Sequence, residues 1–291
     1  MPTKVEKDTV TGTETTGHEW DGIKELNTPL PKWWLYVMYA TIVYSLVYFL
    51  LYPAIPGITG YTKGLIGGSA REALIGKLDK ARERQSAYLD RIAALEPSEI
   101  AADAELLNFA VTGGRAAFAD NCAPCHGLGG SGRPGGFPTL ADDAWIWGGS
   151  LDDIRTTLLH GIRFEENEDT RLSEMPAFGA DELLTGEEIG DLAEHILSYS
   201  GRSEDAGAAA RGATLYAENC ADCHGEGGEG LYELGAPRLN DQIWLYGGER
   251  DQIVAQIGKP KQGVMPAWQD RLSKETIKML TVYVHSLGGG Q

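Results

Sequence analysis

The sequence predicts a mainly α-helical protein, in which one N-terminal transmembrane helix is followed by two tandem small helical domains. Three observations support this fold class. An uncharged apolar run lies near the N-terminus, an internal repeat covers the C-terminal part, and apolar residues in each copy recur at steps of three and four. A chain of 291 residues accommodates an anchor and two small domains rather than one large core.

The chain is acidic, with 42 Asp and Glu residues against 25 Lys and Arg residues and a formal net charge of −17. A nucleic-acid-binding surface needs basic patches, so this class of function is excluded. Negative charge instead suits a basic soluble protein partner, because complementary fields accelerate encounter. Improved solubility is the alternative explanation.

Residues 1–32 are polar and show no hydrophobic periodicity, which predicts an irregular segment. Residues 33–53 form the predicted transmembrane helix, because from Trp33 to Tyr52 the chain carries no charge over a length that crosses a bilayer. This pattern argues against a buried soluble helix, and its late start argues against a cleaved signal peptide. Nearby basic residues are equal in number on the two sides, so charge alone does not orient the helix.

Residues 54–111 are predicted to be a linker with an amphipathic helix over residues 71–96. Apolar residues there, such as Leu74 and Leu78, recur at alternating steps of three and four. This helix is expected to pack on the following domains, while a partner subunit or the membrane surface are alternatives. Pro97 ends it and begins another short helix.

The repeat comprises a first copy, residues 112–201, and a second copy, residues 207–291. Matched residues are Cys122 and Cys220 at an offset of 98, Pro138 and Pro237 at 99, and Met175 and Met265 at 90. The first copy therefore carries nine extra residues, in an acidic loop around residues 164–171. Two copies of one domain are expected, each folded within its own segment.

Each copy is predicted to end in an amphipathic helix. Thr185 and Glu188 have the spacing of a capping box, and Ser273 is placed to cap the second helix. The apolar stripes that follow are Ile189, Leu192 and Ile196 in the first copy and Ile277, Leu280 and Val284 in the second. His195 and His285 occupy matching places in these helices, where helix packing is expected.

Each copy carries one Cys-x-x-Cys-His motif. The motif residues are Cys122, Cys125 and His126 in the first copy and Cys220, Cys223 and His224 in the second. Two thiols at this spacing on a helical turn reach the two vinyl groups of one haem, and the histidine then supplies an axial ligand to the iron. Two covalently bound haem c groups are therefore predicted. A zinc site needs four ligands and a thioredoxin-like motif a βαβ setting, so neither alternative fits.

Met175 and Met265 are the candidate sixth ligands of the two irons. Of the five methionines, only these lie in Met-Pro-Ala segments downstream of a Cys-x-x-Cys-His motif, and each is assigned to the motif that precedes it. The following proline favours extended backbone, which suits a loop over a haem face. Packing in a core is the alternative role. Histidine and methionine ligation raises the reduction potential and suits one-electron transfer.

Four further residues are candidates for contacts around the haems. The carbonyl groups of Pro138 and Pro237 are placed to accept the free N–H of His126 and His224, respectively, which would orient the rings. Trp145 and Trp244 could donate to haem propionates through the indole N–H, and filling of the core explains them equally well.

Each copy resembles a class I cytochrome c domain, in which Cys-x-x-Cys-His and a later methionine supply the ligands. The N-terminal part resembles the dihaem P subunit, or subunit III, of cbb3-type cytochrome c oxidases. Residues 17–23 (GHEWDGI), 29–34 (PLPKWW) and 52–54 (YPA) carry this resemblance, which extends over nearly the whole chain.

The resemblance implies an electron-transfer subunit with no catalytic site of its own. Such a subunit accepts electrons from a soluble or membrane-anchored cytochrome c, or from a bc1 complex. It relays them to a monohaem cytochrome c subunit and then to a haem-copper catalytic subunit that reduces oxygen to water. The implied location is the bacterial inner membrane, with the N-terminus in the cytoplasm and the haem domains in the periplasm.

Two other functions are compatible with the motifs. An independent membrane-anchored electron shuttle would need the same haem ligands, although residues 17–34 exceed what a simple tether requires. A dihaem redox enzyme such as a peroxidase would need one open haem face, and two Met-Pro segments argue against that.

Overall fold

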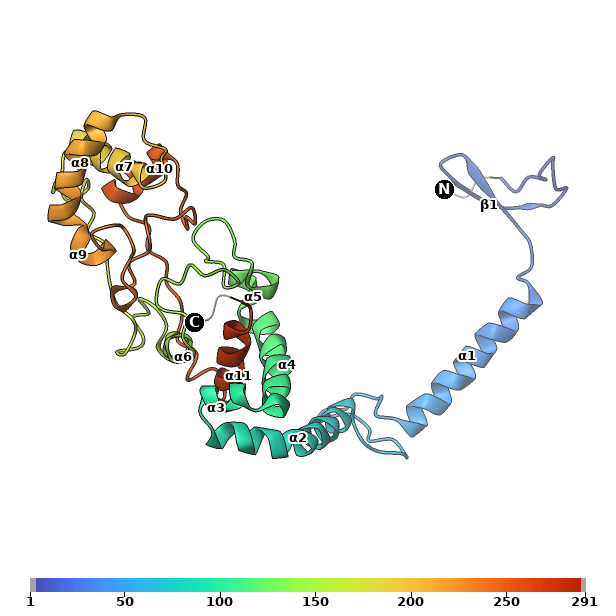
Figure 1. The fold of residues 1–291 in the computed structure, drawn as a ribbon. Helices are drawn as coiled ribbons and strands as arrows, with labels where there is room; N and C mark the ends of the chain where they lie inside the picture. The colour runs from blue at the N-terminus through green and yellow to red at the C-terminus, as the bar shows by residue number, and fades with distance from the viewer. Residues whose placement is uncertain (1–3, 289–291) are drawn as a thin grey trace. The chain divides into compact units, whose positions relative to one another are not determined.

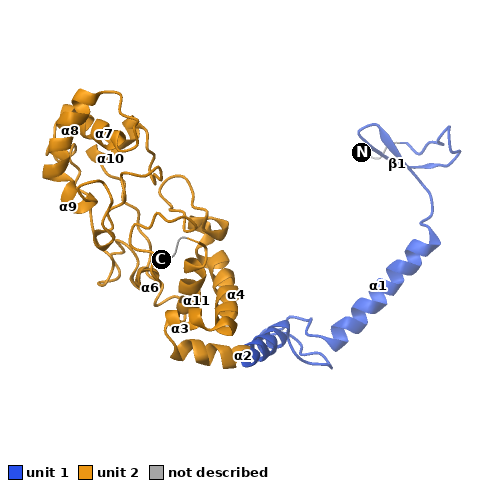
Figure 2. Ribbon diagram, in the orientation of Figure 1, with its two compact units in different colours: residues 1–84 blue, residues 85–291 orange. Residues whose placement is uncertain are grey.

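The computed structural model describes residues 4–288 and divides into two compact units. Unit 1 is Met1–Arg84 and unit 2 is Gln85–Gln291 (Figure 2). The helix α2 (Ala70–Ala94) runs across the boundary between them. The mainly α-helical fold predicted from the sequence is confirmed, with one small exception in unit 1.

The exception is a β-hairpin of β1 (Thr15–Trp20) and β2 (Ile23–Leu26) in the segment expected to be irregular. Trp20 pairs with Ile23 across a two-residue turn, in which Asp21 and Gly22 have φ angles of 52° and 85°. Positive φ at both turn positions defines a type I′ turn, for which Asp-Gly is a preferred sequence. The expectation was therefore wrong because the Asp-Gly signal outweighs the missing alternation.

The helix α1 (Lys32–Leu51) occupies the predicted transmembrane segment. Its mean hydropathy is 1.7, and none of its side chains is buried within the structure. Among residues 4–288, it is the one helix long and apolar enough to cross a membrane. Its bounds lie one to two residues before the predicted 33–53, because the chain turns extended at Tyr52, ahead of Pro53.

The predicted linker helices are also confirmed. The C-terminal part of α2 buries Ile92, whereas Leu74 and Leu78 nearer its start are exposed. Pro97 occupies the first turn of α3 (Pro97–Ala102), as expected. Ile92 and Ile100 then pack against the helices Ala104–Asn121 and Lys274–His285, so this end of the linker belongs to the folded domain.

Unit 2 contains the two copies of the repeat in the same order of elements (Figure 1). The first copy supplies α4 (Ala104–Asn121), α5 (Ala123–His126), η1 (Leu128–Gly130), α6 (Leu151–His160) and α7 (Gly186–Ser198). The second supplies α8 (Ala206–Asn219), α9 (Ala221–His224), η2 (Tyr232–Leu234), α10 (Arg250–Gly258) and α11 (Lys274–His285). The predicted capping box begins α7, and Ser273 caps α11.

The two copies exchange their terminal helices in space. Helix α11 packs against α4 and α6 of the first copy, and α7 packs against α8 and α10 of the second (Figure 1). Both crossings are close: an added Cβ would lie 2.3 Å from the carbonyl oxygen of Met279 at Gly114, and 2.1 Å from that of Asp191 at Gly212. Glycine is therefore required at both contacts.

Each hydrophobic core consequently draws on both copies. The first core combines Phe118, Cys122 and Leu158 with Leu280 and Val284. The second core combines Tyr216, Ile253 and Ile257 with Leu192 and Ile196. The domains predicted at 112–201 and 207–291 correspond to the two copies of the repeat, and each copy contributes its terminal helix to the core of the other copy. The physical reason is that both terminal helices present the same apolar stripe, so the pattern does not specify which partner each helix covers.

The chain crosses between the cores in two loops, residues 161–174 and residues 259–264. Ile162 exchanges two backbone hydrogen bonds with Met265, with N···O distances of 2.9 and 3.0 Å. The amide of Trp268 donates to the carbonyl oxygen of Leu158, and that of Gly179 donates to Gly258. Each methionine segment is thus held by the copy that does not contain it.

Candidate haem centres

The cysteine motifs form single helical turns at the ends of longer helices. Cys122 caps α4, and the amides of Cys125 and His126 donate to its carbonyl oxygen at 3.1 and 2.8 Å. Cys220 stands in the same relation to α8 and His224, whose amide donates to it at 2.9 Å. This turn places both thiols and the imidazole of each motif at one end of a helix.

All four thiols are free. Burial raises the pKa of Cys122 and of Cys220 to about 11, so these groups are thiols rather than thiolates at neutral pH. Within residues 4–288, no cluster of three or more His, Cys, Asp or Glu side chains is arranged to hold a metal ion directly. Each motif thus offers two free thiols and one imidazole, the groups that covalent attachment of haem c needs.

The two histidines are oriented by proline carbonyl groups, as the repeat predicts. Nδ1 of His126 lies 3.2 Å from the carbonyl oxygen of Pro138, and Nδ1 of His224 lies 2.9 Å from that of Pro237. Burial lowers the pKa of both histidines, which favours the neutral ring. With Nδ1–H donating to a carbonyl group, Nε2 is left with the lone pair and is available to a metal.

A cavity of about 450 Å³ lies over the first motif. Cys122, Cys125 and His126 line it together with Met265. Phe118, Leu158 and Val284 are among its apolar walls. Met175 is not part of this lining. The structure therefore brings the first motif together with the methionine of the second copy, contrary to the assignment made from sequence order.

The second motif shows the reciprocal arrangement. Met175 packs against the second core, whose partly buried members include Cys220 and Trp244. The physical reason is the same helix exchange, because Met175 precedes α7 and Met265 precedes α11 along the chain. Each methionine therefore lies, together with the helix that comes after it, in the core of the other copy.

The second site carries a buried donor with an unmet hydrogen bond. Nε1 of Trp244 is buried and has no partner among the described atoms. Leaving such a donor unpaired costs about 1–3 kcal/mol, so a carboxylate that belongs to the site would stabilise it. A haem propionate is such a group, and at the first site the cavity of about 450 Å³ over Cys122, Cys125 and His126 lies within the range of cofactor sites. The residues present therefore fit covalently attached haem.

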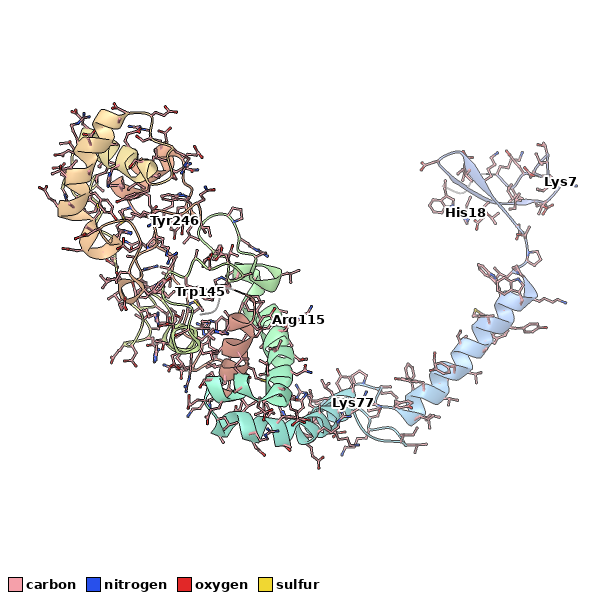
Figure 3. The ribbon with its side chains drawn as sticks, in the orientation of Figure 1. Lys7, His18, Lys77, Arg115, Trp145 and Tyr246 are labelled. Carbon is pink, nitrogen blue, oxygen red and sulfur yellow. The ribbon has the colours of Figure 1, made fainter. Side chains whose placement is uncertain are left out.

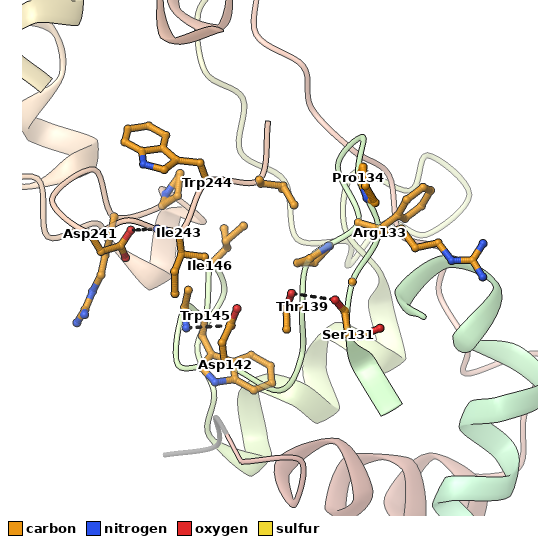
Figure 4. A pocket seen from close by; sticks show the side chains of 17 residues that line it. Ser131, Arg133, Pro134, Thr139, Asp142, Trp145, Ile146, Asp241, Ile243 and Trp244 are labelled. Atoms are coloured by element: carbon orange, nitrogen blue, oxygen red, sulfur yellow. Dashed lines mark hydrogen bonds between the residues drawn. The ribbon is translucent and has the colours of Figure 1, made fainter. Parts of the chain in front are cut away.

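A further cavity of about 300 Å³ lies where equivalent loops of the two copies meet. Pro138 and Trp145 line it from the first copy, and Pro237 and Trp244 line it from the second (Figure 4). Both carbonyl groups that orient the histidines thus border one space. Trp145 also lines the cavity over the first motif, so this space adjoins the first haem site.

Tyr216, which matches Phe118 at the offset of 98, is a site residue that the sequence pattern did not single out. Its hydroxyl donates to the carbonyl oxygen of Gly225 at 2.9 Å, directly after His224. Its ring packs on His195, with the centroids 5.1 Å apart. His195 in turn lies 3.1 Å from the hydroxyl oxygen of Tyr199 and belongs to helix packing, as expected.

Family models match most of the chain. Residues 109–196 and 207–284 match the model described as Cytochrome C oxidase, cbb3-type, subunit III. Residues 12–59 match the model described as the N-terminal domain of cytochrome oxidase-cbb3, FixP. The two matched segments follow the tandem repeat along the sequence, although each core contains parts of both.

Similar proteins cover the full length. The cbb3-type cytochrome c oxidase subunit CcoP of Azospirillum brasilense is 53% identical, covering 98% of this chain and 99% of that protein. The subunit FixPc of Rhizobium leguminosarum bv. viciae is 50% identical, covering 97% and 98%. The subunit CcoP of Cereibacter sphaeroides is 46% identical, covering 95% of each chain.

An apolar anchor helix and a helical unit with two Cys-x-x-Cys-His turns define a membrane-anchored cytochrome of the c type. The full-length similarity specifies the particular family within this class of cytochromes. The chain belongs to the family of cbb3-type cytochrome c oxidase subunits named CcoP or FixP.

Proposed function

We propose that the chain binds two haem c groups and relays electrons within a cbb3-type oxidase. The observation that carries the proposal is the single cavity lined by Cys122, Cys125 and His126 on one side and by Met265 on another. A site with both axial ligands supplied by the protein suits electron transfer rather than chemistry on a bound substrate. The chain thus serves an oxidoreductase complex without holding its catalytic site.

The ligand set follows the spatial pairing. Cys122 and Cys125 would attach the first haem, and His126 and Met265 would hold its iron. Cys220 and Cys223 would attach the second haem, and His224 and Met175 would hold its iron. Each haem supplies one-electron redox chemistry when bound. The protein fixes the histidine rings through Pro138 and Pro237, surrounds the sites with apolar side chains and raises the potentials through methionine ligation.

The two sites are proposed to exchange electrons with each other. Support comes from the cavity between the copies, which is bordered by Pro138 of one site and Pro237 of the other. Electrons would enter from a soluble or membrane-anchored cytochrome c, or from a bc1 complex. They would leave to the monohaem cytochrome c subunit and the haem-copper catalytic subunit. The acidic net charge of −17 favours encounter with a basic donor.

The chain is proposed to lie in the bacterial inner membrane, with its N-terminus in the cytoplasm and both haem sites in the periplasm. Support comes from α1 as the single candidate span of residues 4–288, since one crossing leaves both motifs on the same side. Covalent attachment of haem c on the periplasmic side then determines the orientation.

Co-purification tests this proposal. The tagged chain is solubilised in mild detergent, and its haem types and its oxygen uptake with reduced cytochrome c are measured. Co-eluting b-type haem and oxygen consumption support the oxidase relay. Two c-type haems without turnover, in detergent that preserves such complexes, would favour an independent shuttle. Reduction of hydrogen peroxide by the isolated chain would favour the dihaem enzyme.

A further inference from the structure

One arginine joins the two loops that carry the candidate methionine ligands. Nε of Arg163 donates to the carbonyl oxygen of Gly263 at 2.8 Å, and Nη1 donates to that of Ser173 at 3.0 Å. Gly263 lies two residues before Met265, and Ser173 lies two residues before Met175. A single guanidinium group therefore hydrogen-bonds to the segments that precede both methionines.

The backbone at Arg163 is held in an uncommon conformation at the crossing point. Its φ angle is 49°, in the left-handed region that non-glycine residues seldom adopt. The preceding Ile162 exchanges two hydrogen bonds with Met265, and the amide of Arg163 donates to Arg171 at 2.9 Å. These contacts fix the backbone position of Arg163. Its guanidinium group therefore reaches the carbonyl groups of Gly263 and Ser173 from a fixed starting point.

The matched residue of the second copy supports a role in placing the methionines. At the offset of 99, Arg163 corresponds to Gln262. The side-chain amide of Gln262 donates to the carbonyl oxygen of Met175 and accepts from its N–H, both at 3.2 Å. Residues at equivalent positions of the repeat thus both hydrogen-bond to methionine loops. Gln262 binds the loop of Met175, whereas Arg163 links that loop to the loop of Met265.

We propose that Arg163 is a positioning residue that couples the two methionine loops, so that methionine ligation at both haems depends on this one side chain. The inference rests on the proposed ligand set. The guanidinium group adds a side-chain link between the two loops to the backbone pairing of Ile162 with Met265, and so restricts motion that would draw either sulfur from its iron. Arginine suits this role because its rigid fork serves two acceptors at once.

Competition by imidazole for the iron tests the coupling on the purified, haem-loaded full-length subunit. Imidazole replaces a loosely held methionine more readily than a well-held one. We expect Arg163→Ala to lower the apparent Kd for imidazole at both haems by about tenfold, the usual lower range for loss of a supporting contact. The methionine-to-iron charge-transfer absorption of the ferric protein should weaken in parallel.

Two variants serve as matched controls. Gln262→Ala should lower the apparent Kd for imidazole more at the haem of His224 than at the haem of His126, because its side chain is hydrogen-bonded to Met175 and only lines the cavity over the first motif. Arg115→Ala removes an exposed arginine from α4 (Figure 3) and should change neither haem. Proton NMR of the ferrous protein resolves the two bound methionine methyl groups and so assigns each effect to one haem.

An Arg163→Ala protein that binds imidazole like the wild type, or that changes at one haem only, would overturn the coupling. Should that variant fail to fold, Arg163→Gln applies the same test, since its amide is too short to span both carbonyl groups. A wild-type protein without any methionine-to-iron absorption would instead overturn the proposed ligand set, and the coupling with it.

Discussion

At the scale of single residues, the two haem sites differ most at the matched positions of Phe118 and Tyr216. Phe118 packs on Tyr283, with ring centroids 5.4 Å apart. Tyr216 packs on His195 and Tyr199 and adds a hydrogen bond to Gly225. Phe118 fills the equivalent place in the first site with its ring alone. The hydroxyl group of Tyr216 therefore stabilises the folded protein through its hydrogen bond and is not needed to fill the core.

We expect Tyr216→Phe to lower the free energy of unfolding by about 1 kcal/mol, the usual net value of one hydrogen bond. Haem attachment should be complete, because Phe118 serves the equivalent place in the first site. Denaturation in urea, with haem content measured in parallel, checks both statements. The reverse change, Phe118→Tyr, would bury a hydroxyl group in an apolar core and should destabilise the protein. Failure of Tyr216→Phe to retain its second haem would contradict this account.

At the scale of elements, polar contacts determine which core each terminal helix joins. Nζ of Lys278 in α11 is buried and donates to the carbonyl groups of Ile92, Ala93 and Leu95, which end α2. The matched residue of α7, at the offset of 90, is Glu188, which cannot donate there.

Helix α7 carries the converse specificity. Its Asp191 accepts two hydrogen bonds from Arg211 of α8, at 2.7 and 2.6 Å. The matched residues in α11 and α4 are Thr281 and Gly113, which form no such pair. The apolar stripes thus provide affinity for either core, whereas these charged contacts select between the cores.

We expect Lys278→Ala to lower the free energy of unfolding by about 1–3 kcal/mol, because three carbonyl groups at the end of α2 lose their donor. Thermal or urea unfolding of the purified subunit measures this. Lys274→Ala, which removes an exposed lysine from the start of the same helix, is the control for the loss of one positive charge. Equal effects of the two substitutions would show that the contact with α2 is unimportant.

Glu194 ties α7 to α10 and makes the second core sensitive to acid. Burial alone would raise the pKa of Glu194, but hydrogen bonds from Arg250, Ser203 and the backbone amides of Glu204 and Asp205 lower it to about 2 from the ordinary 4.5. The unfolded chain therefore takes up this proton first. Glu194 stabilises the fold fully above about pH 4.5, and this contribution is lost as the pH falls towards 2.

We expect Glu194→Gln to be less stable than the wild type at neutral pH and to lose less stability between pH 4.5 and pH 2. Urea unfolding at a series of pH values measures the slope. Glu187→Gln removes an exposed carboxylate from the same helix and serves as the control. An unchanged slope for Glu194→Gln would refute the assignment of this acid sensitivity to Glu194.

At the scale of the whole molecule, the helix exchange makes unit 2 one interlaced body. Each core contains a Cys-x-x-Cys-His motif from one copy and a methionine segment from the other. The two crossing loops and the cavity bordered by Pro138 and Pro237 connect the two candidate haem sites. We therefore expect a substitution in the methionine segment of one copy to act on the haem whose cysteines lie in the other copy.

The crossed pairing predicts which potential each methionine controls. In a chain whose second haem is removed by Cys220→Ser and Cys223→Ser, Met265→His should lower the potential of the remaining haem, because histidine lacks the potential-raising effect of methionine. Met175→His should leave that potential nearly unchanged. Redox titration followed by optical spectra measures both. A sequential pairing, with each methionine serving the motif before it, predicts the opposite result.

Local chemistry was determined by the sequence alone. The Cys-x-x-Cys-His spacing, the apolar length of α1 and the caps of α7 and α11 are properties of short segments, so they could be predicted without knowing the fold. The hairpin at Asp21 and Gly22 is also determined by a short segment, because the Asp-Gly turn signal outweighs the lack of alternation. In each case residues close together in the sequence determine the local structure.

Only the tertiary structure decided which terminal helix and which methionine segment pack on each core. The two copies present nearly the same apolar stripes, so periodicity permits either terminal helix on either core. The choice depends on contacts between residues far apart in sequence, such as Lys278 with the end of α2 and Asp191 with Arg211. The positions of Met265 opposite His126 and of Arg163 between the two methionine loops are consequences of that choice.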